Sequence, residues 1–138
     1  MNTEYSIEQI PAELTWGLRQ EVLYPGKPQS LVFIEDDSEG THFGLFHAGK
    51  LIGVISLFNR GNELVFRKFA IKETYQNQKL GSGLLNYVID YAKQTGKKHI
   101  SCNARESALK FYQQFGFSVK GEPFSKNGIN FLTMSKEL

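Results

Sequence analysis

The stretch FAIKETYQNQKLGSGLL, residues 69–85, decides the fold that the sequence predicts. It opens with the end of a strand-like apolar run and closes with two leucines that begin an amphipathic helix. Between Thr74 and Leu85 lie neutral polar side chains, Lys79 and the two glycines Gly81 and Gly83, with no acidic residue. Such a turn at a helix start exposes backbone N–H groups and often binds phosphate. Because first helical turns usually favour Asp or Glu, the absence of carboxylates favours an anion site over a plain strand-to-helix connection.

The apolar pattern on both sides of this stretch predicts a mixed α/β (α+β) fold. The expected elements follow in this order: a strand over residues 4–10, a helix over 11–23, a hairpin over 41–58, a third strand over 62–71, a helix over 80–96, a strand over 98–104, a helix over 108–115, and two closing strands over 117–121 and 129–135. In the third strand the apolar phase changes between Phe66 and Phe69, which predicts a β-bulge near Arg67 and Lys68. We therefore expect a mostly antiparallel central sheet of about 6–7 strands flanked by helices.

Residues 29–39 carry no clear periodicity. They include the acidic run Glu35, Asp36 and Asp37, which we expect to lie in a solvated loop.

The composition narrows the class of protein. A chain of 138 residues is the size of one domain, so residues 1–138 are expected to form a single domain. The formal charge of +2 and the lack of a basic block predict no nucleic-acid binding. One cysteine, Cys102, and the lack of a membrane-length apolar run or a leader sequence favour a cytoplasmic protein without membrane contact. The sequence leaves a homodimer open.

Two common phosphate-binding motifs fit the glycine stretch poorly. The nucleotide P-loop needs Lys and then Ser or Thr directly after its second glycine, whereas Gly83 is followed by Leu84. The dinucleotide fingerprint needs three spaced glycines, and only Gly81 and Gly83 are available.

Together with ARESALKFYQQFGF, residues 104–117, the stretch resembles the GNAT superfamily of acyl-CoA-dependent N-acyltransferases. In that family a bulged strand leads into a loop of pattern Arg/Gln-x-x-Gly-x-Gly/Ala, whose N–H groups bind the coenzyme A pyrophosphate. A later helix carries Asn-x-x-Ala-x-x-x-Tyr and ends in Gly-Phe. The resemblance covers roughly residues 51–121. It implies a bulged strand that is splayed to admit acyl-CoA.

The loop pattern can be aligned in two registers. Gln78, Gly81 and Gly83 satisfy the string directly. Counting from the strand end and from the helix instead puts Gln76 at the Arg/Gln position, Lys79 at the first glycine and Gly81 at the second. We prefer this second register because it preserves the distance between strand and helix. Lys79 then departs from the family pattern and needs either a negative φ or a tolerated left-handed conformation, although its ammonium could meet a phosphate directly.

The resemblance implies acetyl-CoA as co-substrate, an amine acceptor, no metal and a set of site residues. The residues expected to bind acyl-CoA are Phe69, Ala70, Ile71, Gln76, Asn77, Gln78, Lys79, Leu80, Gly81, Ser82, Gly83, Asn103 and Arg105. A backbone N–H freed by the bulge could polarise the thioester carbonyl, and the strand edge could pair with the pantetheine arm. Asn103 and Arg105 are alternatives for the family's asparagine.

Tyr112 lies at the family's tyrosine position and is predicted to be the general acid. The alternative is that Phe111, Tyr112 and Phe115 form an aromatic stripe of the core. No general base stands out: Glu63 and His42 are candidates by residue type only. Cys102 is expected to be a small buried residue without nucleophilic activity.

The sequence thus predicts an acetyl-CoA-dependent N-acetyltransferase that transfers an acetyl group directly to a primary amine of a small molecule, peptide or protein. A non-catalytic acyl-CoA-binding or interaction module of the same fold is the first alternative. An α/β domain without cofactor is the second.

Overall fold

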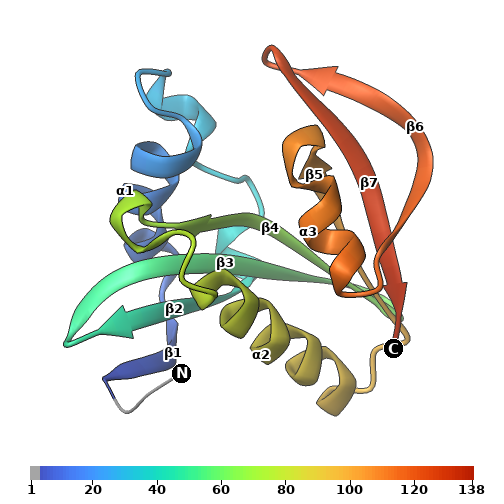
Figure 1. Ribbon diagram of the computed structural model, residues 1–138, viewed down its shortest axis with the longest axis horizontal. Coiled ribbons are helices and arrows are strands. Elements are labelled where there is room, and N and C mark those ends of the chain that lie inside the picture. Colours follow the sequence, from blue (N-terminus) through green and yellow to red (C-terminus); the bar gives the residue numbers. More distant parts are fainter. Residues whose placement is uncertain (1–3) are drawn as a thin grey trace. The chain divides into compact units, whose positions relative to one another are not determined.

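The computed structural model describes residues 4–138, and within these residues it forms a seven-stranded mixed sheet of order β1-β2-β3-β4-β5-β7-β6. The strands are β1 (Tyr5–Ile10), β2 (Thr41–His47), β3 (Lys50–Arg60), β4 (Glu63–Ile71), β5 (His99–Arg105), β6 (Ser118–Lys126) and β7 (Ile129–Glu137) (Figure 1). β4 and β5 are parallel, while β1–β2, β2–β3, β5–β7 and β6–β7 are antiparallel. The predicted mixed, mostly antiparallel sheet is confirmed.

The helices are short except for one. The α-helices are α1 (Trp16–Leu18), α2 (Leu80–Gln94) and α3 (Leu109–Gln114). Single helical turns are η1 (Ala12–Thr15), η2 (Arg19–Leu23), η3 (Gln29–Leu31), η4 (Asp37–Glu39), η5 (Glu73–Tyr75) and η6 (Glu106–Ala108).

The described chain divides into two compact units. The first contains residues 4–58 and 66–88, and the second contains Asn59–Val65 and Ile89–Leu138. β3, β4 and α2 contribute residues to both units. The single domain expected over residues 1–138 stays a prediction.

The helix predicted over residues 11–23 is a succession of three helical turns, η1, α1 and η2. Its apolar residues Leu18, Val22 and Leu23 pack against Ile10 of β1, as well as against residues of β3 and β4. Leu14, which the pattern places on the same apolar face, is instead 51% exposed. The reason is that η1 is a 3₁₀ turn with about 3 residues per turn, which rotates its side chains out of phase with the α-helix that follows.

The predicted hairpin is confirmed in β2 and β3. Its turn is formed by Ala48 and Gly49, both with positive φ (49° and 81°), as expected for a two-residue turn whose twist matches the strands. The strands pair from Thr41 with Leu57 to His47 with Lys50.

β4 changes phase where the sequence predicts a bulge. Lys68 has a φ of 55°, and the rings of Phe66 and Phe69 contact each other edge to face with centroids 6.3 Å apart. Residues three apart in a regular strand point to opposite faces of the sheet. An irregularity at Lys68 therefore brings both rings to one face, at the position where the sequence predicts the bulge.

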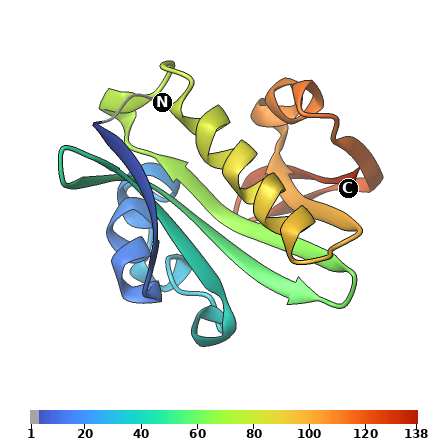
Figure 2. The same cartoon turned by 90° about the horizontal axis from the view of Figure 1, so that it is seen from below.

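Helix α2 is the long amphipathic helix that the leucine pattern predicts. Its buried residues are Leu80, Leu84, Leu85, Val88, Ile89 and Ala92. Within the first unit, the Tyr87 ring contacts Phe43 of β2 at 5.2 Å, and Gly81 faces Phe69 and Ile71 of β4. Figure 2 shows these first turns of α2 lying alongside β4.

In the second unit, β7 lies between β5 and β6, with Cys102 opposite Met134 in the register of β5 and β7. Met134 and Phe117 are buried, whereas all nine residues of β6 are exposed. The predicted helix and closing strands are present here, and Gly116 follows α3 with a φ of 88°, as a glycine that ends a helix.

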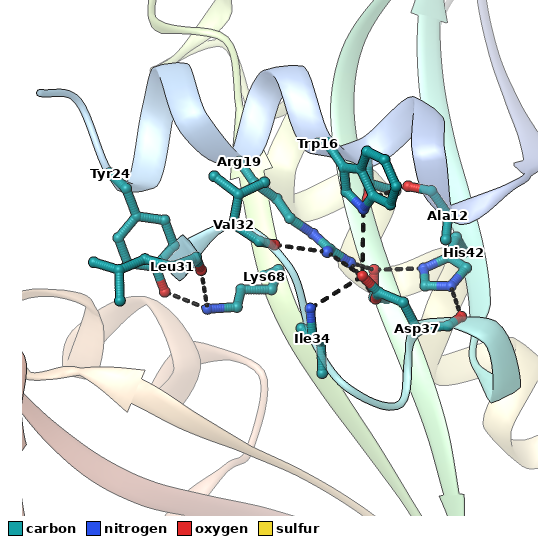
Figure 3. Close-up of polar contacts among 12 residues, drawn as sticks. Ala12, Trp16, Arg19, Tyr24, Leu31, Val32, Ile34, Asp37, His42 and Lys68 are labelled. Carbon is teal, nitrogen blue, oxygen red and sulfur yellow. Dashed lines mark hydrogen bonds and ion pairs between the residues drawn. The ribbon is translucent and has the colours of Figure 1, made fainter. Parts of the chain in front are cut away.

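The position of Asp37 contradicts the expectation that the acidic run lies in a solvated loop. Only 8% of Asp37 is exposed, and its carboxylate accepts two hydrogen bonds from Arg19, at 2.9 and 3.0 Å (Figure 3). Arg19 is fully buried and also donates to the Val32 carbonyl and to Ser56 Oγ, at 3.0 and 2.8 Å. The expectation was wrong because a buried guanidinium 18 residues away draws this one carboxylate of the acidic run into the interior.

This network sets the ionisation of Asp37. Burial by itself opposes the charged form, but hydrogen bonds from Arg19 and from the Ile34 amide outweigh it and hold the pKa of Asp37 below its ordinary value of 3.8. Because the folded pKa is depressed, the stabilisation is fully present above 3.8 and is lost as the pH falls through the lower folded value.

Replacing Asp37 by Asn should leave the buried Arg19 charge uncompensated and lower the free energy of unfolding by about 3 kcal/mol at pH 7. Urea denaturation measures this change, and the gap between wild type and variant should narrow as the pH falls below 3.8. Glu35→Gln, at an exposed carboxylate of the same run, should change stability by less than about 0.5 kcal/mol. Equal effects at both positions would contradict the buried pair.

Candidate functional site

The loop before α2 holds two non-glycine residues in the left-handed region. Asn77 and Lys79 both have a φ of 63°. Lys79 therefore keeps the backbone conformation that glycine adopts most readily, and it does so at the position where the second register places the family's first glycine. Of the two conformations expected at Lys79, a negative φ or a tolerated left-handed one, the left-handed one is present.

The start of α2 presents backbone N–H donors. The Gly83 N–H donates to the Lys79 carbonyl at 3.2 Å, which is the first hydrogen bond of the helix. The backbone N–H groups just before it have no carbonyl within the helix to which they can donate. The first turn contains no acidic residue. The predicted loop residues Gln76, Asn77, Gln78 and Lys79 are exposed. This donor set, N–H groups with a lysine beside them, fits an anionic phosphate.

The predicted loop side chains mainly organise the loop itself. Gln76 Nε2 donates to the Ile71 carbonyl at 2.8 Å, and Gln78 Nε2 donates to the Thr74 carbonyl at 3.4 Å. A Cβ added at Gly81 would lie 3.6 Å from the side chains of Phe69 and Ile71, an ordinary contact. The packing of the chain does not by itself demand a glycine at position 81.

The first unit brings the predicted loop and strand residues together. Leu80 is buried, Gly81, Ser82 and Gly83 are half-buried, and Gly81 faces the β4 residues Phe69 and Ile71. Of the three strand residues, Ala70 is buried in the core on the face covered by the N-terminal helical segment.

A contact beside the bulge was missed by the sequence analysis. The Lys68 ammonium donates to the Tyr24 hydroxyl, lies 4.4 Å from the centre of the Tyr24 ring, and is 3.4 Å from the Leu31 carbonyl (Figure 3). These contacts tie the segment that follows η2 to the strand. No local pattern marks Tyr24, because it lies 44 residues from Lys68.

The remaining predicted residues lie in the second unit. Asn103 is exposed, and its side-chain oxygen accepts a hydrogen bond from Thr133 on β7 at 2.9 Å. Arg105 is the last residue of β5 and is half-buried. Tyr112 lies in α3 and is 8% exposed.

Tyr112 sits in an aromatic cluster. Its ring contacts Phe111 at 5.2 Å and Phe117 at 5.7 Å, both with steep interplanar angles. Burial, and to a smaller extent the Cys102 thiol, raise the pKa of Tyr112 far above its ordinary value, so the phenol stays protonated at neutral pH. Burial likewise raises the pKa of Cys102 to about 12, which makes its thiol a poor nucleophile and agrees with its predicted structural role.

The two base candidates by residue type are held in structural contacts. His42 is buried, with Nδ1 2.7 Å from Ser56 Oγ and Nε2 2.9 Å from the Asp37 carbonyl. A carbonyl oxygen only accepts, so His42 Nε2 carries a proton. Glu63 accepts a hydrogen bond from the Ser101 hydroxyl of the neighbouring strand.

Residues 4–138 contain neither a cluster of metal-binding side chains nor a membrane-spanning helix. No group of three or more His, Cys, Asp or Glu side chains among them is placed to hold a metal ion. None of their helices is both long and apolar enough to cross a membrane.

Comparison with known proteins gives consistent matches. The model of the acetyltransferase (GNAT) domain matches residues 18–138. The uncharacterized N-acetyltransferase YitI of Bacillus subtilis (strain 168) is 31% identical over 142 residues, covering 96% of this chain and 95% of that protein.

Solved structures show the same fold. A protein from Lactobacillus plantarum superimposes with a TM-score of 0.90 at 21% identity, covering 99% of each chain. A GNAT family acetyltransferase from Elizabethkingia anophelis, solved with acetyl-CoA bound, has a TM-score of 0.78 at 20% identity and covers 99% of this chain and 100% of that one.

The left-handed backbone at Lys79 makes a prediction about stability. Lys79→Gly should be more stable than Lys79→Ala by about 1 kcal/mol, because only glycine adopts this φ without steric cost. Thermal or urea unfolding of the two variants measures the difference. At Lys93, in the last turn of α2, the order should reverse by a similar amount because glycine weakens a helix. The same order at both positions would contradict the left-handed loop.

Proposed function

Because the chain belongs to the GNAT acetyltransferase family, we propose that it transfers an acetyl group from acetyl-CoA directly to a primary amine of a small molecule, peptide or protein. The observation that carries the proposal is the loop at the start of α2. Its lysine adopts the glycine-like conformation of the phosphate-binding pattern, and its helical turn carries no carboxylate.

The loop supplies the anion-binding part of the proposed site. Backbone N–H groups within residues 77–82 would hold the pyrophosphate, assisted by the helix dipole and by the Lys79 ammonium. The N–H groups of Gln76 and Gly83 are already bonded to the Glu73 and Lys79 carbonyls. The side chain of Gln76 contributes indirectly, since its bond to the Ile71 carbonyl fastens the loop to the strand end. Acetyl-CoA brings the acetyl group in activated form, as a thioester.

The β4 segment would hold the reacting end. The left-handed backbone at Lys68 would free a backbone N–H of residues 69–71 to polarise the thioester carbonyl and stabilise the oxyanion formed when the amine attacks. The strand edge can also bond the amide-bearing pantetheine arm. Residues 24–31, tied to the bulge by Lys68, would border the acceptor amine.

Tyr112 would donate its proton to the departing thiolate. The phenol is in the protonated form that a general acid needs, while the burial that raises its pKa also makes it a weaker acid. As the tetrahedral intermediate collapses, the bond between the carbonyl carbon and sulfur would break and Tyr112 would protonate the sulfur. The proton lost by the attacking nitrogen would pass to solvent, from which the Tyr112 phenolate would regain one, leaving the new amide and a free thiol.

A non-catalytic acyl-CoA-binding module of the same fold is the second candidate. The packing of Tyr112 among Phe111 and Phe117 favours it, because such a cluster also explains a buried tyrosine by core packing alone. Both candidates bind acyl-CoA, but only the acetyltransferase transfers its acyl group to an amine.

Binding of acetyl-CoA should be seen by calorimetric titration and should stabilise the protein by about 2.7 kcal/mol at a ligand concentration 100 times Kd. S-acetylpantetheine, which lacks the pyrophosphate, is the control and should bind much more weakly. Equal affinity for both compounds would contradict the assignment of the loop. An absence of heat and of thermal stabilisation would exclude both candidate functions.

Tyr112→Phe should lower thiol release with an accepted amine about 100-fold while leaving acetyl-CoA affinity unchanged, as expected for loss of a general acid. Tyr87→Phe, which removes an exposed hydroxyl from α2, should retain full turnover. Unchanged turnover in Tyr112→Phe would remove Tyr112 as the acid. Binding without thiol release across a panel of amines would favour the non-catalytic module.

A further inference from the structure

The strained loop before α2 requires anchors outside itself. Two left-handed residues, Asn77 and Lys79, each carry a steric cost, and such conformations persist only where the surroundings fix them. On the C-terminal side, the buried Leu80, Leu84 and Leu85 fix the helix. On the N-terminal side the chain passes through Tyr75, the residue directly before Gln76.

Tyr75 is fastened to the sheet through His47. Tyr75 Oη lies 2.8 Å from His47 Nδ1, and the two rings meet at a steep angle with centroids 5.3 Å apart. The backbone of η5 adds a turn, because the Tyr75 N–H donates to the Lys72 carbonyl at 2.8 Å. The side-chain bond spans 28 residues and joins η5 to the end of β2.

His47 itself is held on both sides. It is the last residue of β2, opposite Tyr5 in the register of β1, and the Tyr5 ring stacks on the imidazole at 4.5 Å. His47 Nε2 lies 3.2 Å from the Glu4 carboxylate, which can only accept while it is ionised. The proton therefore sits on Nε2 in the neutral ring, and Nδ1 accepts the hydrogen bond from the Tyr75 hydroxyl.

We infer that the hydrogen bond from Tyr75 to His47 positions the loop of residues 76–83 for the coenzyme pyrophosphate, which makes both of them positioning residues. The role in coenzyme binding rests on the proposed function, whereas the role in holding the loop rests on the contacts of Tyr75 and His47 described above. Without this hydrogen bond, Asn77 and Lys79 would leave the left-handed conformation more often. The backbone N–H groups of the loop would then point toward the pyrophosphate position for a smaller fraction of the time. The effect should fall on coenzyme affinity and leave the acceptor side unchanged.

The test compares four variants by amide hydrogen exchange of the ligand-free protein and by titration with coenzyme A. Tyr75→Phe keeps the ring and removes the hydroxyl, and His47→Leu removes the acceptor. Both should speed exchange at residues 76–83 and weaken coenzyme A binding about 3- to 10-fold, the range of one ordinary hydrogen bond. His47→Asn, whose amide oxygen can replace Nδ1 as the acceptor, should recover most of both properties. Tyr87→Phe, the control, should match the wild type.

Kinetics separate positioning from a general loss of structure. In Tyr75→Phe the KM for acetyl-CoA should rise by the same factor, with kcat and the KM for the amine close to wild type. A lower kcat together with higher KM values for both acetyl-CoA and the amine would overturn the positioning role. The same loss of coenzyme A affinity in His47→Asn as in His47→Leu would also overturn it.

The outcomes distinguish this inference from the proposed function. Unchanged exchange at residues 76–83 in Tyr75→Phe overturns the inference, and so does faster exchange with unchanged coenzyme A affinity. If the wild-type protein does not bind coenzyme A, the proposed function fails and the coenzyme role of the bond falls with it. Wild-type binding together with an unaffected Tyr75→Phe variant overturns the inference alone.

Discussion

The ion pair of Arg19 and Asp37 is the constraint on which the first unit of the protein depends. A fully buried guanidinium is tolerated when most of its donors are satisfied. Here a carboxylate, the Val32 carbonyl and Ser56 accept hydrogen bonds from its two terminal nitrogens, while the buried Nε has no partner within residues 4–138. Ser56 in turn bonds His42, which also bonds the Asp37 carbonyl. The pair therefore fixes the segment between β1 and β2 onto the sheet. Once that segment is fixed, Tyr24 and Leu31 lie where Lys68 can reach them.

Backbone strain is concentrated near the proposed chemistry. Among residues 4–138, five non-glycine residues have positive φ. Ala48 and Asn127 lie in hairpin turns, whose geometry calls for this conformation. Lys68, Asn77 and Lys79 lie instead in β4 and in the loop before α2. For the two lysines this conformation costs about 1–2 kcal/mol each relative to a relaxed backbone, whereas asparagine tolerates it better. The sequence placed both irregularities, through the phase change in the strand and through the lysine at a glycine position.

The site was predicted in part, and most of the misplaced or missed contacts have a common cause, which is a partner remote in the chain. Glycines, the missing carboxylates and the change of apolar phase are local features, so the loop and the bulge could be located from the sequence. Asp37 was misplaced because its partner lies 18 residues away, and the contacts of Lys68 with Tyr24 and of Tyr75 with His47 span 44 and 28 residues. Leu14 was misplaced because a 3₁₀ turn cannot be told from an α-helical turn by apolar spacing alone.

The sequence by itself determined the order of strands and helices, the long amphipathic helix, the polar glycine loop and the family. These features follow from periodicity and turn chemistry, in which each residue depends mainly on its near neighbours. Only the tertiary structure decided which polar side chains meet: that Asp37 is buried with Arg19, that Lys68 reaches Tyr24, and that Tyr75 is tied to His47. The physical reason is that a hydrogen bond or ion pair depends on distances of about 3 Å between groups remote in the chain, which local spacing does not encode.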